Sequence, residues 1–211
     1  MPAPSRTFTV RNVQLLRALF AAVAALMITF SSDHSAVVGL SVFSGFASAT
    51  ALVSLLSVWL VHPAGSRWPA ALVGALSLVA AMITSVPALR TDDVFFIVVG
   101  VWALSTGLVE LLAGIRARRI GPDATARDSI IIGCFGILLT VLLWVIPAGF
   151  AYDYTIREAG TFELTGIILG VGMFGGYAAL VAVFLGIAGL TPQKAEAVAT
   201  ASVPVESGDP R

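Results

Sequence analysis

Six long apolar runs, separated by short polar stretches, set the pattern of the chain. They cover residues 13–30, 36–61, 69–86, 94–115, 129–146 and 164–190. Because an α-helix rises about 1.5 Å per residue, runs of about 18 residues or more match a hydrocarbon core about 30 Å thick. The pattern therefore predicts an all-α integral membrane protein with six transmembrane helices.

The fourth run carries the most information. Between residues 94 and 115 its only charged residue is Glu110. Two aspartates, Asp92 and Asp93, precede it, and a basic cluster of Arg116, Arg118 and Arg119 follows it. Acidic residues suit the N-terminus of a helix, whereas arginines suit its C-terminus and the cytoplasmic face of a membrane. The run is predicted to enter at Asp93 from outside and to end inside.

The positions of the charges along the chain predict its orientation. With six spans, both termini lie on one side, and most basic residues fall on that side. These are Arg6, Arg11, Arg17, Arg67, Arg116, Arg118, Arg119, Arg127, Lys194 and Arg211, against Arg90 and Arg157 opposite. Short cytoplasmic loops carry the excess of Lys and Arg, so both termini are expected to be cytoplasmic.

Composition agrees with a membrane protein and narrows the chemistry. The chain is 58% hydrophobic and 11% charged, far from the roughly 25% charged residues of soluble domains. Twelve basic residues balance twelve acidic ones, which gives no reason to expect nucleic acid as a partner. One cysteine, Cys134, and two histidines exclude an intrachain disulfide and make a zinc site improbable. No metal and no cofactor are expected.

The ends of the chain are predicted to lie outside the folded domain. Residues 1–12 are expected to be a disordered cytoplasmic N-terminus, 13–190 a six-helix transmembrane domain, and 191–211 a disordered cytoplasmic tail. A signal peptide is the alternative for the first run. No A-x-A-like site precedes a cut near Ser31, and the run is long for a signal sequence, so a retained helix is favoured.

Prolines and glycines predict how the helices pair. Pro87 and Pro147 each stand at the outer end of an odd-numbered span, which predicts three helical hairpins of consecutive helices. Small residues let helix backbones approach closely. The glycines expected to do so, either within the bundle or between copies of the chain, are Gly100, Gly107, Gly114, Gly166, Gly170, Gly172 and Gly176.

Residues 101–119, VWALSTGLVELLAGIRARR, resemble the hallmark helix of the HdeD-like (DUF308) bacterial membrane proteins. The shared features are an aromatic-rich entry, a central glycine, a following glutamate and a terminal arginine cluster. Arg17 and the turns at Pro87 and Pro147 also resemble the layout of that family, although the first hairpin lacks its proline and the outer loop 148–163 is long. The resemblance implies a six-helix protein of the bacterial inner membrane, linked in some members to acid stress, and no catalytic residues.

Glu110 is the main candidate for chemistry, because an ionisable group inside a span is costly and calls for a partner. Arg17 is the expected partner, since both residues lie about one to two turns from the cytoplasmic boundary. Thr106, one turn before Glu110, is expected to support the pair with its hydroxyl. The pair is either a proton- or ion-responsive site or a structural pin between the first and fourth helices, and a further alternative is that Glu110 extends toward Arg116 and the lipid headgroups. His34, beside outer acids, is a weaker candidate for acid sensing.

Three functions are weighed. The favoured one is a non-enzymatic HdeD-like protein, acting in envelope stress or as an accessory subunit through contacts with lipids, other membrane subunits or copies of itself. Its basis is the near absence of buried polar groups and of any soluble domain. The alternative is a small transporter or channel with Glu110 as the ion- or proton-coupling site, which predicts polar residues converging on one pathway. A lipid-modifying enzyme needs two cooperating groups on one face, and the inner half offers Glu110 and little else.

Overall fold

The computed structural model describes residues 8–63, 65–121, 124–147, 149–157 and 160–191. Within these residues, six helices are long and apolar enough to cross a membrane, which confirms the predicted number of spans. They are α1 (Val10–Phe30), α2 (Ala36–Leu60), α3 (Trp68–Ser85), α4 (Asp92–Ile120), α5 (Ala124–Val145) and α6 (Gly166–Leu190). A single turn of 3-10 helix, Pro87–Leu89, follows α3.

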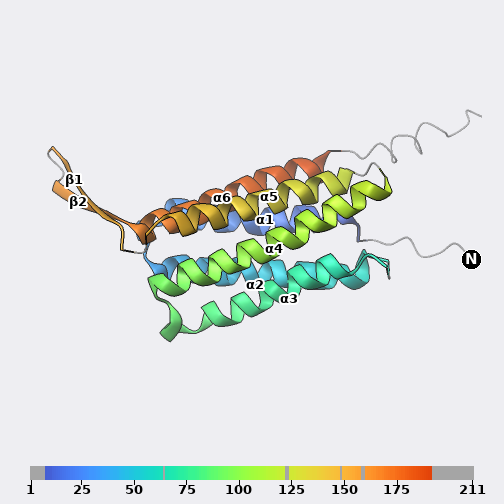
Figure 1. Cartoon of the computed structure of the whole chain (residues 1–211), viewed down its shortest axis with the longest axis horizontal. Coiled ribbons are helices and arrows are strands. Elements are labelled where there is room, and N and C mark those ends of the chain that lie inside the picture. The colour runs from blue at the N-terminus through green and yellow to red at the C-terminus, as the bar shows by residue number, and fades with distance from the viewer. Residues whose placement is uncertain (1–7, 64, 122–123, 148, 158–159, 192–211) are drawn as a thin grey trace, which may run out of the picture.

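The helices run side by side along the long axis of the molecule (Figure 1). The first residues of α1 and the last residues of α6 lie at the same end, where the Arg11 Nε donates a hydrogen bond of 2.6 Å to the Gly189 carbonyl. A β-hairpin projects from the opposite end. We call these the basic end and the hairpin end, because of the arginines that gather at the first.

Two helices begin earlier than their hydrophobic runs. Helix α1 starts at Val10, so residues 10–12 are helical rather than disordered, and α5 starts at Ala124 rather than near residue 129. Polar contacts account for both extensions: Arg11 is bound to α6, and Gln14 Nε2 donates to Asp128 Oδ2 at 2.9 Å. Hydropathy alone misses such turns because their side chains are polar. The expected disorder of 1–7 and 192–211 concerns residues outside those described.

The outer segment expected to be a loop forms a β-hairpin instead. Strands β1 (Ala151–Ile156) and β2 (Gly160–Thr165) pair antiparallel, with Ala151 opposite Thr165. Their β-branched and aromatic residues favour strands, and Gly160 has φ 102°, which glycine adopts at little cost. The N–H of Gly166 donates to the Phe150 carbonyl at 2.8 Å, which joins the hairpin directly to α6.

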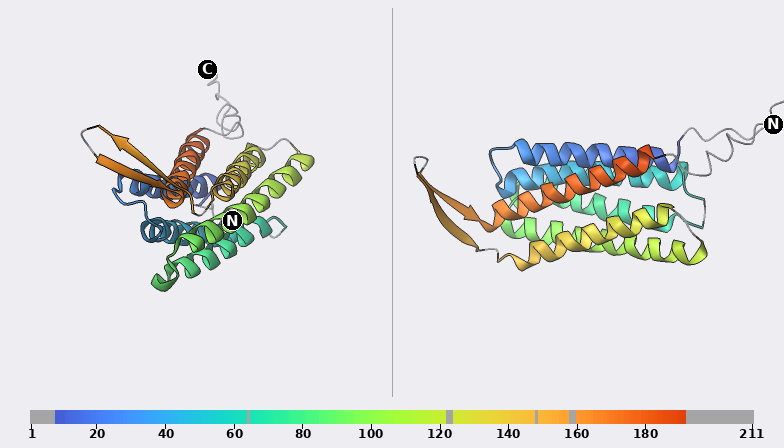
Figure 2. Two further views of the ribbon diagram at one scale, coloured as in Figure 1. Left: turned by 60° about the vertical axis from the view of Figure 1, so that its left-hand side comes forward. Right: turned by 90° about the horizontal axis from the view of Figure 1, so that it is seen from above.

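The helices pack most tightly as the pairs α1–α6, α2–α3 and α4–α5 (Figure 2). The grouping expected from the sequence, with α1–α2, α3–α4 and α5–α6 as hairpins, describes the looser contacts. Glycines explain the difference for α4 and α5. A Cβ added at Gly107 would lie 2.9 Å from the Gly133 carbonyl oxygen, and one at Gly136 would lie 2.8 Å from that of Ala103. Backbone meets backbone here, as only small residues allow.

The predicted packing glycines divide into two groups. A Cβ at Gly100 would meet Trp144, one at Gly114 the Ala126 carbonyl and one at Gly170 the rings of Phe95 and Phe96, while Gly166 is buried at the start of α6. For Gly172 and Gly176, nothing lies within 4 Å of a Cβ built there, so they make no close contact within the described bundle, and a contact between copies of the chain stays a prediction. Instead Gly175 packs on Ile28 and Gly189 on Leu15, so a different face of α6 meets α1.

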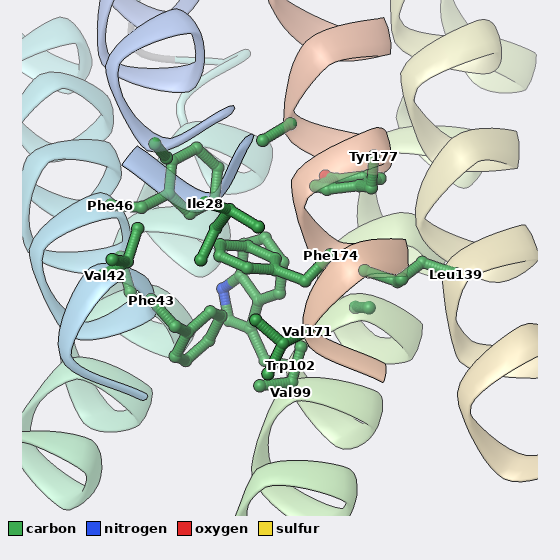
Figure 3. Close-up of a cluster of buried hydrophobic side chains, with 14 of the residues drawn as sticks. Ile28, Val42, Phe43, Phe46, Val99, Trp102, Leu139, Val171, Phe174 and Tyr177 are labelled. Carbon is green, nitrogen blue, oxygen red and sulfur yellow. The ribbon is translucent and has the colours of Figure 1, made fainter. Parts of the chain in front are cut away.

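Aromatic side chains fill the core on the hairpin side of Arg17 and Glu110 (Figure 3). Phe43 and Phe46 of α2 meet Trp102 of α4 edge to face, with ring centroids 5.2 and 5.6 Å apart, and Phe174 of α6 lies 5.5 Å from Phe43. Such edge-to-face contacts are favourable beyond the area they bury. The Trp102 Nε1 donates to Ser77 Oγ at 3.0 Å, which ties this cluster to α3.

Candidate functional site

Arg17 of α1 and Glu110 of α4 form an ion pair inside the bundle. The Arg17 Nη2 lies 2.7 Å from Glu110 Oε1, and the two side chains are 20% and 12% exposed. The sequence expected these residues to meet because they lie at the same depth. The two side chains are therefore largely buried, and both line cavities inside the bundle.

Thr106 takes a different role from the one expected. Its hydroxyl donates to the Trp102 carbonyl at 2.7 Å, one turn back along α4, and is not hydrogen-bonded to Glu110. Threonine in a helix commonly bonds the carbonyl four residues earlier, which satisfies the hydroxyl proton within its own helix. Thr106 therefore lines the space beside the pair without supporting the carboxylate directly.

A cavity of about 500 Å³ opens at the basic end and reaches the ion pair. We call it the vestibule. All six helices contribute to its wall, together with the turn between α2 and α3. Its polar lining includes Gln14, Arg17, Ser54, His62, Glu110 and Asp128. A volume in this range is typical of small-molecule sites, although those are usually more apolar. Of the polar residues that are buried in the described part of the chain, Gln14, Ser54 and Ser57 line this space.

Helix α1 carries the polar residues that hold the vestibule together. Arg11, Gln14 and Arg17 follow one another at intervals of three residues, so they lie near one face of the helix. They contact three different helices: Arg11 the end of α6, Gln14 the start of α5, and Arg17 the middle of α4. The last two contacts join the α1–α6 pair to the α4–α5 pair across a loosely packed boundary.

A second, much smaller cavity lies on the other side of the ion pair. Its volume is about 10 Å³, room for about one water molecule, and its wall includes Thr50, Trp102, Thr106 and Tyr177 as well as the pair itself. Arg17 and Glu110 line both cavities and so separate them. Beyond the small cavity stand the aromatic rings of Figure 3. The polar space is therefore open at the basic end and closed toward the hairpin end.

Tyr177 is the site residue that the sequence did not single out. It comes from α6, its ring lies 6.1 Å from that of Trp102, and it borders the small cavity together with Arg17 and Glu110. The glycine-rich apolar run around it gives no sign of a site. Tyrosines of membrane proteins are common at the membrane interfaces, whereas Tyr177 is far from either end of its helix. That central position is the signal by which the sequence could have revealed it.

The two ends of the bundle carry opposite charge. Among the described residues, the acidic groups at the basic end are Glu110 and Asp128, against Arg11, Arg17, Arg67, Arg116, Arg118, Arg119 and Arg127. At the hairpin end, Asp33, Asp92, Asp93, Asp153 and Glu163 outnumber Arg90 and Arg157. Arg116 lies over the Trp68 ring at 5.5 Å, a cation–π contact at the rim of the vestibule.

His62 lines the vestibule just after α2. Partial burial lowers the pKa of its imidazole, because the charged form loses hydration there. The backbone N–H of His62 donates to the Ser57 carbonyl at 3.1 Å, and the His62 carbonyl accepts from Arg67 Nε at 3.0 Å. His34 stands in the turn before α2 at the hairpin end, where Asp33 bonds the backbone and hydroxyl of Ser35. The two histidines therefore lie at opposite ends.

The described part of the chain holds no group of three or more His, Cys, Asp or Glu side chains that could bind a metal ion. Cys134 is exposed on α5 and does not belong to the hydrophobic core.

Comparisons with protein-family models, with curated proteins and with solved structures found no match for this chain. The likeness to the HdeD-like family therefore stays a prediction that rests on the quoted residues. The six apolar helices place the chain in the class of multi-pass membrane proteins. Its site is a polar vestibule that ends on a buried ion pair.

Proposed function

We propose that the protein is a small membrane transporter in which Glu110 is the proton-coupling site. The observation that carries the proposal is the vestibule of about 500 Å³, which is open at one end of the bundle and ends on the Arg17–Glu110 pair. Ionisable residues inside transmembrane segments typically mark substrate or proton pathways when they border a water-filled cavity.

This proposal replaces the accessory role that the sequence favoured. That role was based on the near absence of buried polar groups, whereas Gln14, Thr50, Ser54, Ser57 and Thr106 are all buried in the bundle. The alternative expected polar residues to converge on one pathway, and it is supported by the five of these buried residues that line the two cavities. HdeD-like membership and a part in acid stress are compatible with a proton-coupled protein and remain part of the proposal.

The proposed coupling follows from where the ion pair lies. Proton uptake by Glu110 neutralises its carboxylate and removes the charge that holds Arg17, so the contact between the α1–α6 and α4–α5 pairs weakens. The tight glycine contacts within each pair remain. Movement of one helix pair against another would then separate the aromatic rings that lie between the small cavity and the hairpin end, while the vestibule closes. The positive-inside bias assigns the basic end to the cytoplasm, and no catalytic step is required of any residue.

The experiment measures proton movement in vesicles that contain the purified protein and a pH-sensitive dye, under a potassium diffusion potential. Wild-type protein is expected to carry protons faster than protein-free vesicles, and Glu110→Gln is expected to abolish the difference. Glu163→Gln is the matched control, because it removes a carboxylate from the exposed β-hairpin. The proposal fails if Glu110→Gln vesicles carry protons as fast as wild type, or if wild-type vesicles match empty ones.

A further inference from the structure

We propose that the vestibule binds a small oxyanion, with Arg17 as its anchoring cation and Glu110 as the competitor for that cation. The inference rests on the proposed function, since it names the class of ligand that the same site would take. The ligand is defined by its chemistry: a carboxylate, phosphate or sulfate group that can accept several N–H hydrogen bonds from a guanidinium.

The hydrogen bonds of Arg17 leave room for a second acceptor. A guanidinium has five N–H donors, and within the described residues Arg17 reaches one acceptor, Glu110 Oε1. The fifth of its side chain that remains exposed borders the two cavities. An oxyanion that enters the vestibule can therefore approach Arg17 while the glutamate is still bound, and can replace it fully once the glutamate is neutral.

The surroundings favour an anion over a cation. Arg116 stands at the rim on the Trp68 ring and forms no ion pair with a described carboxylate. Five further arginines belong to the same end of the bundle without lining the vestibule: Arg11, Arg67, Arg118, Arg119 and Arg127. The lining itself holds Arg17 and Arg116 against Glu110 and Asp128, so the excess of positive charge comes from the surrounding end, and it raises the local concentration of anions there. A cation would meet this field first and would find Glu110 already paired.

The titratable and charged groups around Glu110 allow one simple coupling. Arg17 faces it from α1, Tyr177 from α6, and Arg116, Asp128 and His62 line the vestibule from α4, α5 and the turn after α2. The described residues of α3 that line these cavities are not ionisable. A proton that moves from the vestibule onto the Glu110 carboxylate leaves Arg17 with a full positive charge and no counterion. Binding of the proton therefore raises the affinity for the anion, and binding of the anion raises the affinity for the proton by the same factor.

Equilibrium dialysis of the full chain in lipid nanodiscs tests the inference, with radiolabelled sulfate and formate as probes at about pH 5.5 and about pH 7.5. Both probes stay ionised between these values, so any pH dependence belongs to the protein. Wild-type protein is expected to bind at least one probe about tenfold more tightly at the lower pH, within the usual range of coupled sites. Glu110→Gln is expected to bind with the tighter affinity at both pH values.

Variants of the arginine complete the test. Arg17→Gln made in the Glu110→Gln background leaves no buried charge unpaired, and it is expected to lose binding of the probes. Arg90→Gln, at the hairpin end, removes one arginine far from the vestibule and is expected to bind as wild type does. Nanodiscs with and without an anionic phospholipid separate the two sources of the group: competition by the lipid assigns the site to a headgroup, and its absence assigns it to a soluble ion.

Three results would overturn the inference: no binding of sulfate or formate to wild type or to Glu110→Gln, equal affinity of these two proteins at both pH values, or full binding by the double variant. None of them bears on proton flux. A protein that carries protons through Glu110 and binds neither probe keeps the proposed function and loses the oxyanion. A protein that binds the probes with the expected pH dependence but carries no protons loses the transport function alone.

Discussion

At the scale of single residues, the ion pair is costly to keep for stability alone. Removing two charges from water is unfavourable, and well-packed hydrophobic residues often stabilise a protein more than a buried pair does. Arg17 and Glu110 stand between two cavities and connect separate helix pairs, where a stabilising contact is least needed and a switchable one is most useful. Position, more than strength, is the reason why we propose a switchable role for this pair.

His62 gives the clearest pH prediction at this scale. Because burial lowers the pKa of the folded imidazole, an NMR titration of the histidine rings should place His62 below the ordinary value of about 6.5. The unfolded chain then binds the proton more readily than the folded one. The free energy of unfolding should therefore fall as pH drops from about 6.5 toward the folded pKa.

His62→Gln should remove that part of the pH dependence, and His34→Gln, which leaves His62 in place, identifies the two resonances. A His62 resonance that titrates at or above the ordinary value would contradict the assigned burial.

At the scale of elements, glycine positions determine which helices stay together. The backbones of α4 and α5 touch at Gly107, Gly133 and Gly136, whereas Gly172 and Gly176 of α6 face open space. Each transmembrane helix is almost uniformly apolar, so hydropathy alone does not reveal which face meets a neighbour. The backbones of α4 and α5 are therefore in close contact, whereas the polar contacts of Gln14 and Arg17 cross the looser boundary between the α1–α6 and α4–α5 pairs.

Gly136→Ala tests this division. The new methyl group would lie 2.8 Å from the Ala103 carbonyl oxygen, a backbone atom, and the strain should cost about 1–3 kcal/mol and lower the thermal midpoint in detergent. Gly172→Ala is the matched control in open space, and it should leave the midpoint unchanged or raise it slightly, because alanine favours helix over glycine. Equal effects of both substitutions would show that close contact is not what holds α4 to α5.

How much of the structure can be predicted from the sequence also depends on the element concerned. The six spans and the meeting of Arg17 with Glu110 follow from run length and depth, because helix geometry fixes the distance along the membrane. Three features depend on which helix faces meet: the vestibule, the pairing of the helices and the position of Tyr177 at the site. The order of apolar and polar residues along the chain does not specify which faces meet. The β-hairpin was missed because its alternation is confined to 6-residue strands between spans.

At the scale of the whole molecule, the charge difference between the two ends and the opening of the vestibule lie along the same axis. The vestibule opens where the arginines gather, and the acidic hairpin end is closed by aromatic rings. A membrane potential that is negative inside would draw protons toward the basic end if that end is cytoplasmic. The orientation of the bundle therefore decides whether the vestibule is an entrance or an exit for protons.

Single cysteines introduced into a Cys134→Ala background test that orientation. In intact cells, a membrane-impermeant maleimide should label Thr161→Cys of the hairpin and should label Ser66→Cys, in the turn between α2 and α3, only after the membrane is opened. The reverse pattern would place the arginines outside and would reverse the proposed direction of transport. Labelling of both from one side would contradict the six-span topology itself.

The exposure of Cys134 has a practical consequence for studying motion. It is the only cysteine of the chain and lies on the outer surface of α5. The native protein thus brings its own attachment point for a lipid-soluble nitroxide, on the helix pair that holds Glu110. Electron paramagnetic resonance on a chain with one further cysteine introduced on α1 or α6 would follow the separation of the two halves as acid is added.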